Sequence, residues 1–314
     1  MNATQSIFSL RQSRASYHRR LTTIDLATKL GYVLSVVSWQ ALAKGDVHLY
    51  ADSPGWKTLE ACGLSKLWDT VDSTTIDDLK TNFTGTLEYP NGFWSAIKLE
   101  AWSKSLTVNG ESASVDTDLW LLEDLDTYFG PRGRSFALHD EPLSRYLVKD
   151  QIPFGPEFPA IKLDWGAQPV NSSVLYLEPG PMRNQYFDLM RLFVANNHVL
   201  ESLPAKHREM LAGWPTVYLE QHLSTQVAAL HGQVIKPLLS WRSQGPTHLQ
   251  LANTRGVFHL WLKKKDVESW SRSWWPPSRQ RWTNYVKYWG KHLTAKHPEA
   301  LKFFTKAERD VFSC

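Results

Sequence analysis

The chain has 314 residues, of which 42% are hydrophobic and 21% are charged. These are ordinary globular values, so they exclude a chain that is disordered throughout, and the length suits one large α/β domain or two smaller ones. The net charge of +4 is compatible with an anionic ligand but too small to argue for nucleic acid.

Targeting signals and cysteine usage indicate where the protein resides. No apolar run approaches the roughly 18 residues of a transmembrane helix. The first twenty residues are polar and basic, and they lack the apolar stretch of a secretory signal. Of the two cysteines one is the last residue, Cys314, which argues against a structural disulfide and for a reducing compartment. We therefore expect a cytoplasmic protein.

The first half of the chain predicts alternating strands and helices. We expect a strand at 5–10, a helix beginning at Asp25, a strand at 47–51, a short helix at 56–62 and a short strand at 68–71. This β-α-β-α-β order predicts an α/β fold with a mostly parallel sheet between helices. Ligands of such sheets bind beyond the carboxyl ends of the strands. Asp52 follows the second strand, so it marks one such end.

The later elements are expected as follows. Residues 72–92 read as a polar connection, 93–105 as a helix, 130–155 as an irregular insertion, 173–177 as a strand, 182–196 and 217–230 as helices, and 234–239 and 257–262 as strands. From residue 266 the chain becomes rich in Trp, Arg and Lys, with two short helices expected after Pro276-Pro277. We therefore divide the chain into a domain at 1–265 and a helical extension at 266–314.

Two carboxylates, Asp116 and Asp118, interrupt the apolar stretch from Ser114 to Leu122. In an extended strand they would point to the same side, roughly 7 Å apart, and repel each other unless a cation lay between them. A divalent cation is the usual solution. The alternative is an Asx turn in which both side chains cap backbone amides.

Three further features bear on this pair of carboxylates. Lys98 lies at the edge of the apolar face of the preceding helix, where it either snorkels to solvent or reaches an anion. His259, near a late strand, could add a nitrogen ligand that suits Mn²⁺ better than Ca²⁺. Lys263 to Lys265 follow it and could balance a diphosphate. The alternatives are a core histidine and a solvated lysine run.

The order of these motifs resembles GT-A-type glycosyltransferases, and in particular an uncharacterised, largely bacterial glycosyltransferase-like family. The resemblance covers roughly residues 5–265. It is carried by Ser38-Trp39, Leu49 to Gly55, Trp94 to Lys98, Val115 to Asp118, Val170 to Val174, Leu219 to Gln221 and His259 to Lys264.

The resemblance implies a GT-A, Rossmann-like nucleotide-diphospho-sugar transferase fold and a set of site residues. It implies that Asp116, Asp118 and His259 bind Mn²⁺ or Mg²⁺. The residues that we assign to cofactor binding are Asp52, Lys98, Asn171, Gln221, Lys263 and Lys264. The expected activity is metal-dependent transfer of a sugar from a nucleotide-diphosphate donor to an unknown acceptor, which is a glycan, a lipid-linked sugar or a protein. An inverting enzyme would need a catalytic base, for which Asp164 and Glu220 are the candidates, and a retaining enzyme would not.

Departures from the family pattern support an alternative function. Leu262 and Ser173 stand where glycines are expected, and Ser112-Ala113-Ser114 replaces an aromatic and histidine run. Loss of a glycine near a phosphate site can block close approach, so the alternative is a catalytically degenerate module that binds a nucleotide sugar or carbohydrate. We expect no nucleic acid as a partner, because acidic residues dilute the charge of the C-terminal tail. We expect that tail to contact the acceptor or a membrane surface.

Overall fold

The structure is a computed structural model. It describes residues 1–8, 24–84, 94–124, 134–143, 162–195, 218–239, 256–259 and 276–313.

Within these residues seven strands form one central sheet, in the order β3-β2-β1-β4-β7-β6-β8. The strands are β1 (Asn2–Ile7), β2 (Val47–Ala51), β3 (Thr70–Asp72), β4 (Ser112–Val115), β6 (Phe136–Asp140), β7 (Val170–Tyr176) and β8 (Lys236–Leu239). Strand β7 runs antiparallel to both neighbours, and the other pairs are parallel. The predicted α/β class with a mostly parallel sheet is confirmed. A second, antiparallel sheet pairs β5 (Leu119–Leu121) with β9 (Val257–His259).

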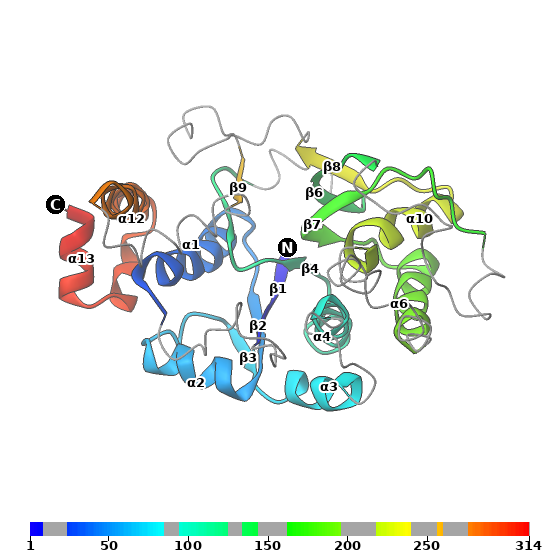
Figure 1. Cartoon of the computed structure of the whole chain (residues 1–314), viewed down its shortest axis with the longest axis horizontal. Coiled ribbons are helices and arrows are strands. Elements are labelled where there is room, and N and C mark those ends of the chain that lie inside the picture. Colours follow the sequence, from blue (N-terminus) through cyan, green and yellow to red (C-terminus); the bar gives the residue numbers. More distant parts are fainter. Residues whose placement is uncertain are drawn as a thin grey trace.

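Helices cover both faces of the central sheet (Figure 1). Their bounds are α1 (Leu26–Leu42), α2 (Ser53–Ala61), α3 (Thr75–Thr84), α4 (Trp94–Val108), α6 (Pro181–Ala195), the π-helix η3 (Tyr218–His222), α10 (Leu223–Leu230), α12 (Pro276–Lys296), the 3-10 helix η6 (Pro298–Phe303) and α13 (Lys306–Ser313). One core lies among α1, β5 and the C-terminal helices, a second among α4, α6 and α10, and a small third cluster joins β2, α3 and α4. Across the described ranges, no helix is long and apolar enough to cross a membrane.

Several predicted elements have shifted bounds. The predicted helix at 56–62 begins earlier, at Ser53, because Asp52 caps it and Pro54 suits the first turn. Strand β1 lies three residues before the expected 5–10, because its pairing with β2 runs from Ala3 to Ile7. Strand β3 is likewise displaced from the predicted 68–71. By contrast, the helix beginning after Asp25 and the strand at 47–51 have their predicted positions.

Two elements were missed and one was interpreted wrongly. The connection predicted at 72–92 contains α3, and the insertion predicted at 130–155 contains β6. After Pro276-Pro277 the structure has one helix of 21 residues, then η6 and α13, where two short helices were expected. The described part of this extension shares its core with α1 and β5. The division at residue 265 itself stays a prediction.

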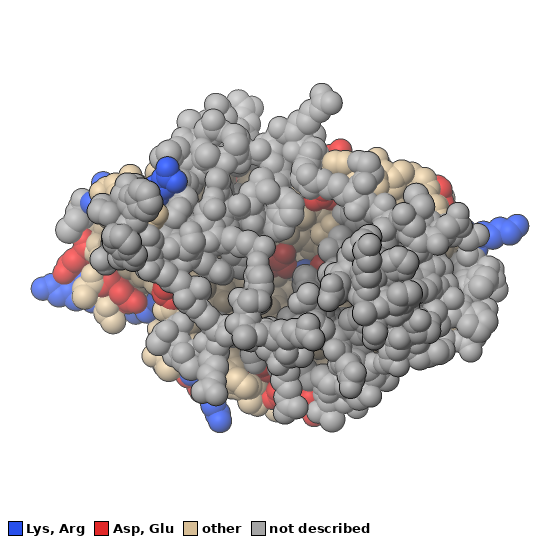
Figure 2. Space-filling view, viewed as in Figure 1, with Lys and Arg blue, Asp and Glu red and all other residues tan. Residues whose placement is uncertain are grey.

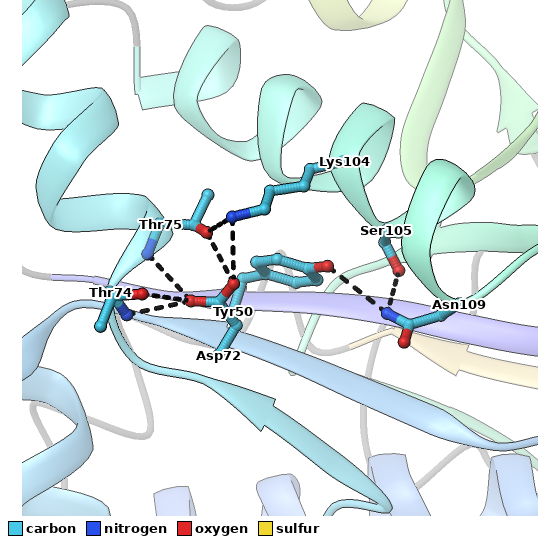
Figure 3. Close-up of polar contacts among 7 residues, drawn as sticks. All are labelled: Tyr50, Asp72, Thr74, Thr75, Lys104, Ser105 and Asn109. Carbon is cyan, nitrogen blue, oxygen red and sulfur yellow. Dashed lines mark hydrogen bonds and ion pairs between the residues drawn. The ribbon is translucent and has the colours of Figure 1, made fainter.

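Asp72, at the carboxyl end of β3, starts the unexpected helix α3 (Figure 3). One of its oxygens accepts hydrogen bonds from the backbone amides of Thr74 and Thr75 at 3.0 and 2.9 Å, and the other accepts from the Thr75 hydroxyl at 2.6 Å. Lys104 of α4 lies 3.4 Å from the same carboxylate. Partial burial alone would raise the pKa of Asp72, but these hydrogen bonds and Lys104 lower it well below the ordinary value.

We expect Asp72→Ala to lower the free energy of unfolding by about 1 kcal/mol at pH 7, because the amides of Thr74 and Thr75 at the start of α3 lose their acceptor. Because the folded-state pKa is depressed, this contribution is fully present above the unfolded-state pKa of about 4 and is lost as the pH falls through the folded-state pKa. Urea unfolding of both proteins at pH 7 and pH 3 would measure the difference. Asp78→Ala, an exposed acidic residue in the same first turn, is the control; an equal loss there would contradict the capping role.

Candidate functional site

The carboxyl ends of β1, β2 and β4 lie at one edge of the sheet, because these strands are parallel neighbours. The amide of Asp52, directly after β2, donates to the carbonyl of Ile7 at 3.1 Å and ties two strand ends together. The Asp52 carboxylate is fully buried and accepts from the Gly55 amide at 2.8 Å. A Cβ on Gly55 would lie 2.5 Å from that carboxylate, so the contact requires glycine. Asp52 therefore builds this edge, and its predicted cofactor contact stays a prediction.

The two carboxylates of the D-x-D sequence lie in a turn between β4 and β5. Strand β4 ends at Val115 and β5 begins at Leu119, and the Leu119 amide donates to the Asp116 carbonyl at 3.3 Å. The pair therefore lies in a turn at the end of a strand, as one of the two interpretations expected, and not in extended backbone. The Asp116 amide donates to the carbonyl of Ser173 on β7 at 2.7 Å, which fixes the start of the turn.

A buried ion cluster lies beneath this turn. The Lys98 ammonium on α4 is 2.6 Å from Oδ1 of Asp116 and 3.2 Å from Oε1 of Glu220 on η3. The hydroxyl of Ser172 on β7 donates to the other oxygen of Glu220 at 3.2 Å. Lys98 and Glu220 are buried, whereas the side chain of Asp116 is one-third exposed at 33%. Asp116 is thus the member of the cluster that reaches solvent.

The electrostatics of the cluster follow from its burial. Burial raises the pKa of Glu220 and Asp116 adds to the increase, while Lys98 and Ser172 oppose it. Burial alone would lower the pKa of Lys98, but the two carboxylates outweigh it, so the pKa is raised and the ammonium stays charged. Glu220 lies in a π-helix, a wide turn that is frequent at functional sites. The Tyr186 hydroxyl anchors that turn by donating to the Leu219 carbonyl at 3.0 Å.

The structure brings His259 to the same turn through the backbone. In the pairing of β5 with β9, His259 lies opposite Leu119, the residue after Asp118. Two distant parts of the sequence therefore meet beside the D-x-D turn, as a shared site requires. The His259 side chain, Lys263 and Lys264 lie outside the residues whose placement is described.

Two other predicted residues have different partners. Asn171 is buried on β7. Its side-chain oxygen Oδ1 accepts a hydrogen bond from the Ser173 backbone amide at 3.0 Å, and its side-chain Nδ2 donates to Glu141 at 3.5 Å. Neighbouring strand residues point to opposite sides, so Asn171 and the Glu220-bound Ser172 face different ways. Asp164 lies in an exposed turn, where its carboxylate accepts from the Gly166 amide at 2.9 Å. Gln221 is half-buried beside Glu220 on η3.

The sequence interpretation missed two features of the cluster. Ser172 was only part of a weak motif, and Glu220 was considered as a base but not as a partner of Lys98. The available signal was the place of Glu220 near the start of an apolar helix, where a carboxylate needs a nearby donor or cation.

The D-x-D turn has ligands of the right chemistry for a hard divalent cation. Within the described ranges, no group of three or more His, Cys, Asp or Glu side chains could hold a metal ion. Asp116 and Asp118 nevertheless supply carboxylate oxygens at the sheet edge, and Mg²⁺ or Mn²⁺ commonly uses one or two carboxylates with phosphate and water. A metal-diphosphate site at this turn stays a prediction. Figure 2 shows a few carboxylate atoms near the middle of the face that is turned toward the reader.

Known proteins resemble the chain in structure only at low sequence identity. No protein-family model and no curated protein sequence matches the chain. Among solved structures, PaToxG glycosyltransferase is 12% identical, over 99% of this chain and 83% of that chain, with a TM-score of 0.30. Mouse xyloside xylosyltransferase 1 in its apo form is 13% identical, over 82% of this chain and 97% of that chain, with a TM-score of 0.37.

We expect Lys98→Met to lower the free energy of unfolding by roughly 3 kcal/mol, because it leaves a buried carboxylate without its cation. Lys98→Met with Glu220→Gln should recover part of this loss, since Glu220 is then neutral. Urea unfolding of the full chain would measure both. Lys104→Met is the control on the same helix; its side chain is 47% exposed, so its loss should stay below about 1 kcal/mol. Equal losses for Lys98→Met and Lys104→Met would refute a buried ion cluster.

Proposed function

We propose that the chain is a glycosyltransferase that binds a nucleotide-diphosphate sugar at the carboxyl edge of the sheet. The observation that carries this proposal is the D-x-D turn after β4, with Asp116 held by Lys98 and His259 adjacent through the β5–β9 pairing. A departing diphosphate develops negative charge that a bound cation and nearby ammonium groups can stabilise. This arrangement supports a GT-A-type donor site of the kind that the sequence resembles.

Each site residue has a distinct proposed task. Asp116 and Asp118 would hold Mn²⁺ or Mg²⁺, with His259 as a further ligand; the metal, when bound, would act as a Lewis acid toward the diphosphate. Lys98 fixes the Asp116 carboxylate and keeps positive charge beneath it. We keep Lys263 and Lys264 as phosphate contacts, because they closely follow His259 in the sequence. Asp52, Asn171 and Gln221 complete the proposed donor site.

The position of Glu220 argues against its use as a catalytic base. Its carboxylate is buried beneath Asp116 and engaged by Lys98 and Ser172. We assign Glu220 a positioning role, which is to hold the Lys98 ammonium against Asp116. The base of an inverting reaction would then be Asp164, which is exposed in the turn before β7.

The proposal extends to the acceptor and to the cellular location. We propose a cytoplasmic enzyme that transfers the sugar to a glycan, a lipid-linked sugar or a protein. The exposed Arg281, Lys291 and Lys296 give α12 a basic outer face. This face suits contact with an anionic acceptor or a membrane surface.

One observation favours the alternative of a catalytically degenerate binding module. Lys98 already provides Asp116 with a cation at 2.6 Å, so the turn is partly neutralised without metal. In such a module the nucleotide sugar or carbohydrate would bind without metal and without turnover.

We expect nucleoside diphosphates to raise the thermal unfolding temperature only when Mn²⁺ is also present. Asp118→Asn should abolish both this shift and Mn²⁺-dependent hydrolysis of the sugar donor, because the cation loses a charged ligand. Differential scanning fluorimetry and an assay of released nucleoside diphosphate would measure the two effects.

The matched control is Asp124→Asn, which changes a nearby surface carboxylate paired with Lys44 at 3.3 Å. It should leave both effects intact. Donor turnover that is unchanged in Asp118→Asn would refute the metal assignment. A shift that needs no Mn²⁺, with no turnover, would establish the binding module instead.

A further inference from the structure

Two serines of α1, Ser35 and Ser38, bond to the backbone on either side of the D-x-D turn. They are three residues apart, so they share one face of the helix, and both are almost completely buried. Ser38 belongs to the Ser38-Trp39 pair that carries part of the family resemblance. The proposed function gives neither serine a task.

Ser38 holds the segment after the turn. Its hydroxyl oxygen accepts a hydrogen bond from the backbone amide of Leu121, a buried residue of β5, at 2.9 Å. The next amide, that of Leu122, donates at 2.7 Å to the carbonyl of Gly256, the residue directly before β9. Successive amides of a strand point to opposite sides, so the Leu121 amide points away from β9. A buried amide needs an acceptor, and Ser38 supplies it from the helix.

Ser35 holds the start of the turn. Its hydroxyl donates to the backbone carbonyl of Asp116 at 3.4 Å and accepts from Nε2 of Gln5 on β1 at 2.7 Å. The orientation of the Gln5 amide is fixed, because its Oε1 accepts from the Trp68 indole at 2.8 Å and an indole nitrogen can only donate. Nε2 of Gln5 therefore faces Ser35, and the hydroxyl hydrogen of Ser35 is left to bond to Asp116.

Helix α1 itself is held firmly in place. Asp25 caps its first turn, and the buried Lys29 ammonium is 3.0 Å from Glu308 of α13. The ring of Trp120 on β5 packs over Gly31, where a Cβ would lie 3.9 Å from it. A turn that is tied to this helix is therefore tied to the core of the protein.

We propose that Ser35 and Ser38 are positioning residues, which tie both ends of the D-x-D turn to α1 and so fix the direction of its two carboxylates before a ligand binds. This inference rests on the proposed function, in which those carboxylates bind a cation. Fixing them in advance spares the ligand the free energy of ordering them. Lys98 holds the Asp116 side chain from α4, and the two serines hold the backbone from α1.

The anchor at Ser38 can be tested without any ligand. In Ser38→Ala we expect the Leu121 amide to exchange with solvent about fivefold faster, the equilibrium factor for one neutral hydrogen bond. The Leu122 amide, which bonds to Gly256, should keep its exchange rate and serves as the internal reference. Hydrogen exchange of the full chain, followed by nuclear magnetic resonance, would measure both amides. Unchanged exchange at Leu121 would overturn the proposal.

The positioning role is tested by titration with Mn²⁺ alone, following free Mn²⁺ by electron paramagnetic resonance. Ser35→Ala and Ser38→Ala should each weaken binding by up to about fivefold, because a fraction of the molecules loses the turn geometry. Ser38→Thr keeps the hydroxyl and should bind as the parent chain does, even if its extra methyl group lowers stability.

Ser105→Ala is the matched control. Ser105 is equally buried, but it lies on α4 and its hydroxyl accepts from Thr4 at 2.7 Å rather than bonding to the turn. Its loss should lower stability and leave Mn²⁺ binding unchanged. Equal weakening of Mn²⁺ binding in Ser105→Ala would show that lost stability lowers the affinity, and would overturn the positioning role.

The outcomes separate this inference from the proposed function. If Asp118→Asn weakens Mn²⁺ binding but neither serine-to-alanine variant of α1 does, the positioning role is wrong and the metal site stands. If Asp118→Asn leaves Mn²⁺ binding unchanged, both the metal site and the positioning role are wrong. Weaker binding in Asp118→Asn and in both α1 variants, with Ser105→Ala unaffected and binding restored in Ser38→Thr, supports both.

Discussion

The candidate site depends on one buried ammonium group, that of Lys98, between two carboxylates. A charge removed from water needs close partners of opposite sign, and Lys98 has Asp116 at 2.6 Å and Glu220 at 3.2 Å. Asp116 lies in the D-x-D turn after β4, and Glu220 lies on the π-helix η3. The ion cluster therefore fixes α4, the D-x-D turn and η3 relative to one another. The buried Lys98 and Glu220 therefore hold Asp116 so that part of its side chain is exposed to solvent.

The D-x-D turn is also where two cores of the protein meet. Lys98, Ser172 and Glu220 belong to elements on the side of α4 and α6, whereas Trp120 packs with α1 and α12. The two carboxylates are thus separated by one residue but have different surroundings. A site of this kind draws its rigidity from both faces of the sheet, which suits ligands that must be held in a fixed geometry.

Local patterns in the sequence predicted the fold class, several elements and part of the candidate site. Alternating strands and helices gave the α/β class, Asp25 and the strand at 47–51 were placed correctly, and Asp116 and Lys98 were singled out for one site. The sequence did not reveal the features that depend on contacts between distant parts of the chain. Strand β6 looked irregular because its pairing partner β7 lies about thirty residues later, and α3 depends on the cap at Asp72. The pairing of Lys98 with Glu220 joins residues far apart in the chain, so no local spacing reveals it.

The reversed direction of β7 has a consequence for the order of folding. Strands β1 to β4 are parallel neighbours joined by local crossovers, so they can associate before the remainder of the chain is present, and Lys98 can meet Asp116 at that stage. Strand β7 must then insert beside β4, and η3 must follow before Glu220 arrives. Contacts between distant segments form slowly because loop closure opposes them. We therefore expect the second carboxylate to join the ion cluster after the first.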